Sequence, residues 1–135
     1  MTTPAVVFPI GHDRYAVATS VVREVVSEPR PTRLPTAPTE LLGAFNLRGE
    51  VIPLFDTAAL LGIGTIAGGP VAIVVNTTVG PAALVVSGLP QFVVLDGDAG
   101  ASELRGTLGV FTIDDGLAVL LDVDELLMPH AGPAA

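Results

Sequence analysis

LLGAFNLRGEVIPLFDTAALLG, residues 41–62, is the stretch of sequence that decides the fold. Two apolar runs, 41–47 and 50–55, stand on either side of a short polar connection. Arg48 and Gly49 form that connection, and Gly49 supplies a backbone angle that most residues resist. Short apolar runs joined by so tight a turn are typical of a β-hairpin.

A short helical turn is predicted directly after the second run, over 57–62. Asp56 or Thr57 can cap its first turn, and Gly62 can end it. A second stretch, GVFTIDDGLAVLLDVDELL at 109–127, repeats the order of glycine, strand, polar turn, strand, aspartate and short helix. The repetition predicts two similar β-subdomains, each closed by a helical turn.

The rest of the chain is divided into equally short segments. Twelve prolines and fifteen glycines are spaced throughout it, a pattern that favours an all-β barrel or sandwich. We expect strands at 5–10, 14–19, 30–34, 41–47, 50–55, 71–76, 82–87, 91–95, 106–113 and 117–122. We expect helical turns at 20–26, 57–62 and 122–127.

One domain is expected over residues 1–135, with its core at about 6–127 and flexible termini. Half of the residues are hydrophobic, enough to bury a core without metal or disulfide support. The segment 96–106 gathers Gly, Asp and Ala without periodic apolar residues, which predicts a mobile loop.

Composition excludes several classes of function. Cysteine is absent, which removes disulfides, thiolate metal sites and thiol nucleophiles, and suits a reducing cytoplasm. The only basic residues are six arginines, set against fourteen carboxylates, and the formal charge is -8. A nucleic-acid surface needs a basic stripe, and the chain offers only a weak cluster at Arg23, Arg30 and Arg33. We therefore expect a cytoplasmic protein that binds no nucleic acid.

The uncharged segment 57–95 is long enough to cross a membrane. Glycine and proline divide it into apolar runs of five or six residues, which are typical of buried β-strands. The first fourteen residues lack the basic leader of a signal peptide. No membrane insertion is therefore expected.

Several short motifs match part of a cofactor-binding or metal-binding pattern, but the residues around them do not fit that pattern. Residues 62–67 fit G-x-G-x-x-A by letter, but they follow a predicted helical turn and not a strand. Asp96-Gly-Asp98 begins like a calcium loop, but its twelfth position is Thr107, which cannot supply a bidentate carboxylate. His12 and His130 have no metal-ligand spacing. We expect no metal, no cofactor and no enzyme activity, which leaves a binding module.

Arg48 itself has two interpretations on the residues alone. It can be a solvated residue of a hairpin turn. It can also project from a rigid β-scaffold to pair with a carboxylate of a partner, because a guanidinium suits such pairing. Turn chemistry leaves both interpretations open.

The stretch 41–62 resembles the hallmark segment of the CheW family of bacterial chemotaxis coupling proteins, whose pattern is roughly G-x-x-N-x-R-G-x-x-x-P-x-x-D-L. The matching positions are Gly43, Asn46, Arg48, Gly49, Pro53 and Asp56. Other segments are similar too, so the resemblance extends from about Val6 to Leu127.

The resemblance implies two intertwined, SH3-like, five-stranded β-barrels with short helical turns. It implies a non-enzymatic adaptor that bridges the cytoplasmic tip of a chemoreceptor to the regulatory domain of a CheA-type histidine kinase. Such a protein is cytoplasmic and reaches membrane receptor arrays through its partners. Carried over by position, the residues at or near the receptor-binding groove would be Val22, Glu24, Gly43, Arg48 and Gly49.

Two alternatives remain beside the adaptor: a stand-alone module that binds the kinase without receptors, and a small-ligand-binding β-barrel. The chain also departs from the family pattern. Ser87 stands where the family usually has an acid, Thr57 replaces a common leucine, and the loop at 96–106 is shorter. These departures concern the choice of partner more than the fold.

Overall fold

The computed structural model describes residues 2–66, 69–97, 100–102, 104–114 and 116–128. Most of these residues lie in strands, which confirms the all-β class. The strands are β1 (Thr2–Ile10), β2 (Asp13–Ala18), β3 (Val22–Ser27), β4 (Leu41–Leu47), β5 (Glu50–Asp56), β6 (Val71–Thr77), β7 (Gly80–Val86), β8 (Gln91–Asp96), β9 (Thr107–Ile113) and β10 (Gly116–Leu121). The short helices are η1 (Thr19–Val21), α1 (Thr57–Leu61) and α2 (Val123–Leu127).

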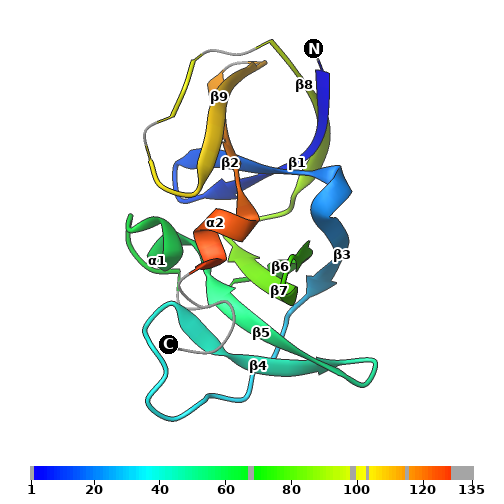
Figure 1. Ribbon diagram of the computed structural model, residues 1–135, viewed down its shortest axis with the longest axis vertical. Helices are drawn as coiled ribbons and strands as arrows, with labels where there is room; N and C mark the ends of the chain where they lie inside the picture. The colour runs from blue at the N-terminus through cyan, green and yellow to red at the C-terminus, as the bar shows by residue number, and fades with distance from the viewer. Residues whose placement is uncertain (1, 67–68, 98–99, 103, 115, 129–135) are drawn as a thin grey trace.

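The strands form two five-stranded sheets with the same pattern of strand pairing but different connectivity (Figure 1). The first sheet has the order β8-β1-β2-β10-β9, and the second has the order β3-β6-β7-β5-β4. Each sheet contains one parallel pair, β10 with β2 and β5 with β7, and its other pairs are antiparallel. The two predicted β-subdomains are thus confirmed.

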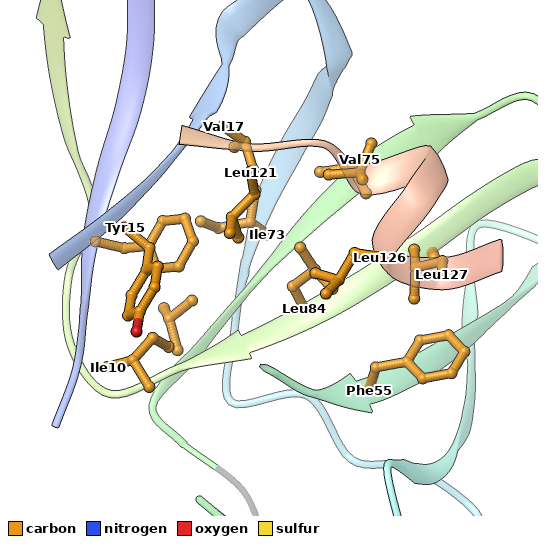
Figure 2. Close-up of a cluster of buried hydrophobic side chains, with 14 of the residues drawn as sticks. Ile10, Tyr15, Val17, Phe55, Ile73, Val75, Leu84, Leu121, Leu126 and Leu127 are labelled. Carbon is orange, nitrogen blue, oxygen red and sulfur yellow. The ribbon is translucent and has the colours of Figure 1, made fainter. Parts of the chain in front are cut away.

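The two sheets share a central core. One cluster of buried side chains is built from strands of the first sheet alone, and another from strands of the second. The largest cluster joins the sheets and includes Tyr15 of β2, Leu84 of β7 and Leu126 of α2, which are labelled in Figure 2. Because α2 packs on both sheets through this cluster, the subdomains form one hydrophobic unit.

Each of the two α-helices follows the second strand of a hairpin and is capped by the aspartate at the junction. An Asp56 carboxylate oxygen accepts a hydrogen bond from the Ala59 N–H at 3.1 Å, and Asp122 does the same for the Glu125 N–H at 3.2 Å. Gly62 ends α1 in the left-handed conformation, with φ of 73°. The helical turns predicted at 57–62 and 122–127 are confirmed.

The helical turn predicted over 20–26 is wrong. A single 3-10 turn, η1, leads directly into strand β3, which pairs with β6. The segment is rich in valine, whose branched side chain is restricted in a helix and packs well in a pleated sheet. Tertiary pairing with β6 therefore decides its conformation.

The strand predicted over 30–34 is also wrong. Only Thr32 pairs there, in an isolated bridge to Ala44 of β4. Pro31 and Pro35 lack the N–H that a ladder requires, so pairing cannot extend along this segment.

Two predictions fall partly outside the described residues. In the loop at 96–106, residues 98–99 and 103 are not described, and Gly100 forms an isolated bridge with Val110. Mobility of this loop therefore stays a prediction. Met1 and residues 129–135, on which the flexible termini and His130 fall, also lie outside. Among the helices that the structure describes, none has the length and apolar character needed to cross a membrane.

Candidate partner-binding site

Arg48 and Gly49 form the two-residue turn between β4 and β5. Leu47 and Glu50 pair across it, and the φ angles of Arg48 and Gly49 are 51° and 87°. Positive φ at both central positions is typical of a type I′ turn, where Asn, Asp and Gly are favoured. The Gly49 N–H donates to the Asn46 side-chain oxygen at 2.9 Å, which fixes the turn.

The sequence predicted the unusual backbone angle at Gly49 and missed the one at Arg48. A residue with a Cβ atom is disfavoured by about 1–2 kcal/mol in the left-handed region. Arginine is therefore a poor choice for forming this turn. Strained residues of this kind gather at functional sites, which favours a role for the Arg48 side chain.

Two ion pairs connect this turn to strand β3. Arg48 Nη2 pairs with Glu24 Oε2, and Arg23 Nη1 lies 2.7 Å from Glu50 Oε1. Arg23 also donates from Nε to the side-chain oxygen of Asn76 on β6, at 3.1 Å. We call Arg23, Glu24, Arg48 and Glu50 the charged quartet.

A β-bulge in β3 explains how two consecutive residues reach the same turn. Val22 pairs with Val75 of β6, but Glu24 pairs with Val74, so Arg23 is the extra residue. In a regular strand, neighbouring side chains point to opposite faces. A bulge re-aims a side chain, and here Arg23 and Glu24 both contact the β4–β5 turn.

Exposure divides the charged quartet into supporting and presented groups. The Arg48 side chain is 70% exposed, whereas that of Glu24 is 28% exposed. The hydrogen bond to Glu24, together with the charge of Glu24, raises the pKa of Arg48, so its guanidinium stays charged. A guanidinium carries five N–H donors. Arg48 can therefore bind a carboxylate of a partner while it remains paired with Glu24.

Strand β3 and the edge strand of the other sheet, β8, both carry apolar side chains. Val22 is half-buried and packs against the central core. Phe92 and Val94 on the neighbouring sheet edge, β8, are exposed by 67% and 49%. Phe92 pairs across the sheet with Val6, which also packs against the central core. In Figure 1, β3 follows below β1 and β8 on one side of the molecule. Sequence reasoning missed Phe92 and Val94, because FVVL reads as a buried strand.

Gly43 lies away from the quartet, towards the other end of β4. A Cβ atom there would meet the Thr32 carbonyl oxygen at 2.4 Å, and the φ of Gly43 is 147°. The Ala44 N–H and C=O exchange hydrogen bonds with Thr32 at 3.0 and 2.7 Å. This close approach of the segment between β3 and β4 explains the glycine. The structure brings Glu24, Arg48 and Gly49 together, with Val22 beside them.

Ser87, at the position where the resemblance gives an acid, makes a structural contact. Its hydroxyl oxygen accepts a hydrogen bond from the Gly11 N–H at 3.0 Å, which ties β7 to the β1–β2 turn. A surface depression of about 520 Å³ lies here, lined in part by His12, Thr65 and Ser87. Within the described residues, no cluster of His, Asp and Glu could hold a metal ion.

Part of the chain is similar in sequence to known chemotaxis proteins. Over 58 residues the chain is 40% identical to the probable chemotaxis protein CheW of Rhizobium etli and 38% identical to the chemotaxis protein CheW of Rhizobium meliloti. Each match covers 43% of this chain, and the aligned stretch spans only 37% of either relative's own length.

A solved structure extends the similarity to the whole fold. The scaffolding protein TtCheW from Thermoanaerobacter tengcongensis superposes with a TM-score of 0.81, covering 94% of this chain and 93% of that one. Sequence identity is 24%, so this match speaks to the fold alone. The family model of the CheW-like domain matches residues 4–129. The chain therefore belongs to the CheW-like domain family, as the resemblance of residues 41–62 predicted.

Proposed function

We propose that this protein is a non-enzymatic adaptor in bacterial chemotaxis or related motility signalling. It bridges the cytoplasmic tip of a chemoreceptor to the regulatory domain of a CheA-type histidine kinase, in the cytoplasm beside the receptor array. Family membership and the relatives named as chemotaxis proteins support this assignment.

The observation that carries the proposal is the presentation of Arg48. An exposed arginine occupies a strained turn position on a rigid hairpin and is oriented by Glu24. Natural turns favour other residues at this position. We infer that Arg48 is kept because its guanidinium binds a carboxylate on the receptor.

The receptor surface combines this charge with apolar contacts. A helical receptor tip that lies along Val22, Phe92 and Val94 would bury its own apolar face. Arg48 and Glu24 would fix the position of the helix through paired charges. Gly49 allows the turn that places Arg48, while Gly43 contributes by holding the backbone of β4 close to Thr32.

Titration calorimetry of the full chain against two purified partners tests the proposal. The partners are a receptor cytoplasmic fragment and the kinase regulatory domain of the same organism. We expect both to bind with micromolar affinity. Failure of both to bind would contradict the adaptor, and binding of the kinase domain alone would favour the stand-alone regulatory module.

Substitutions at Arg48 test the assigned contact. Arg48→Ala and Arg48→Glu should weaken receptor binding, the second more strongly, while kinase binding and Tm stay nearly unchanged. Arg105→Glu is a matched control, because Arg105 lies between β8 and β9 and donates to the Glu125 carbonyl instead. Equal loss of receptor binding in the Arg105 control would show a general charge effect.

A further inference from the structure

Arg23 is the member of the charged quartet that the proposed function leaves unexplained. It is the extra residue of the β3 bulge, and it contacts two different strands: Glu50 at the start of β5 and Asn76 at the end of β6. Its side chain is 34% exposed, about half the exposure of Arg48. Arg23 is therefore placed to hold other residues and is less available to a partner.

Glu50 is the residue that most needs to be held. It follows Gly49 directly and lies two positions from Arg48, and its side chain is 48% exposed. A carboxylate so close to Arg48 can compete for the guanidinium, and it repels any carboxylate that approaches Arg48 from a partner. The pairing of Glu50 with Arg23 directs this negative charge toward β3.

We propose that Arg23 is a specificity-determining positioning residue of the receptor surface. By neutralising Glu50 and holding it against β3, Arg23 leaves Arg48 as the outward charge of the turn. The surface then accepts a receptor helix that carries a carboxylate. The inference rests on the proposed function, because it concerns the partner of that same surface.

Removal of Arg23 followed by removal of Glu50 tests the inference. Arg23→Ala should weaken binding of the receptor cytoplasmic fragment about threefold to fivefold, because the freed Glu50 then repels the partner's carboxylate. Glu50→Ala alone should bind at least as tightly as the unaltered chain. The double variant Arg23→Ala/Glu50→Ala should regain most of the affinity that Arg23→Ala loses.

This rescue separates a charge effect from a folding effect. If Arg23 only supported the fold, replacing Glu50 by alanine as well would not restore binding. Affinity for the kinase regulatory domain should stay constant across all three variants. Arg23→Lys should retain most of the receptor affinity, since the lysine keeps the charge beside Glu50.

The outcomes distinguish this inference from the proposed function. Absence of receptor binding by the unaltered chain would overturn both. Binding that is weakened by Arg48→Ala but unaffected by Arg23→Ala would overturn the inference alone. A double variant as weak as Arg23→Ala would overturn it as well.

Discussion

The hairpin β4–β5 with α1 and the hairpin β9–β10 with α2 are two versions of one design. In both, the second strand pairs in parallel with a neighbour, β7 or β2, and then leads through an aspartate cap into a five-residue helix. They differ in how the cap is used and in what the turn carries. The repeated part builds the scaffold, so the differences indicate where each half is specialised.

The caps differ in burial and in the number of backbone groups bound. Asp56 is 1% exposed and also accepts a hydrogen bond from the Ile66 N–H at 2.7 Å. Asp122 is half-buried and caps α2. Asp56 therefore fixes the chain after α1 as well as the helix itself.

The turns differ in their contacts. The β4–β5 turn is joined to β3 by the two ion pairs of the charged quartet. The outer face of the β9–β10 hairpin instead carries exposed aliphatic side chains, Leu108 and Leu117, at 60% and 56% exposure. Among the described residues, the two ion pairs to β3 thus distinguish the first hairpin from the second.

The largest predicted loss of stability comes from removing the Asp56 cap, and it should exceed the loss from removing the Asp122 cap. Asp56→Ala removes the cap and leaves the Ile66 N–H without its carboxylate, so we expect a loss of about 3 kcal/mol in the free energy of unfolding. Asp122→Ala should lose about 1 kcal/mol, as an ordinary cap does. Urea unfolding followed by circular dichroism measures both, and equal losses would refute the difference in role.

A somewhat smaller effect separates two glycines of β4 and its turn. Gly43→Ala places a Cβ atom against the Thr32 carbonyl, and we expect a loss of about 2–3 kcal/mol. Gly49→Ala meets no atom within 4 Å and suffers only from its positive φ, so about 1 kcal/mol is expected. The same urea unfolding reports both, and the reverse order would show that Gly43 is not sterically required.

Alkaline pH should destabilise the protein through Tyr15 of β2, in the core that joins the two sheets. Burial, with a smaller effect of Asp13, raises the pKa of Tyr15. Leu84 of β7, which lies in the same core cluster, has no group that titrates. A raised pKa in the fold means that the protonated tyrosine stabilises it below about pH 10, and this stability is lost as the pH rises further.

Tyr15→Phe isolates this effect, since Tyr15 is the chain's only tyrosine and lysine and cysteine are absent. The free energy of unfolding should fall as the pH rises above about 10 in the unaltered chain and stay flatter in the variant. Urea titrations at several pH values measure it. Parallel curves would show that Tyr15 is not responsible.

The smallest predicted effect concerns the strain at Arg48. Arg48→Gly should raise Tm slightly, because glycine adopts the left-handed conformation freely. Receptor binding should fall in the same variant, because the guanidinium is lost. Stability and binding would then change in opposite directions. A fall in Tm would mean that the pairing with Glu24 outweighs the strain.

Sequence reasoning predicted the elements that local signals define. The hairpins, the aspartate caps and Gly62 follow from residue types at fixed spacing, and all were found. It failed at β3, where the spacing of the valines suits both a helix and a strand and a helix was predicted. It also failed at Thr32, where prolines limit the pairing to one bridge. Both failures concern pairing between segments distant in sequence, which local propensity does not encode.

The candidate site was predictable only in part for the same reason. The pattern around Arg48 and Gly49 identified the turn, and the resemblance added Glu24 and Val22. The partners Arg23, Glu50 and Asn76 became visible only through the β3 bulge and the closure of the hairpin onto β3. A bulge has no reliable signature in a single sequence.

The division of strands between the sheets also affects how the chain folds as it is synthesised. The second sheet uses consecutive strands, β3 to β7, and can close as soon as they leave the ribosome. The hairpin of β1 and β2 must wait for β8, β9 and β10 before its sheet is complete. Contacts so distant in sequence form slowly. During translation, we therefore expect the β1–β2 hairpin to remain without its sheet partners until β8, β9 and β10 have been synthesised.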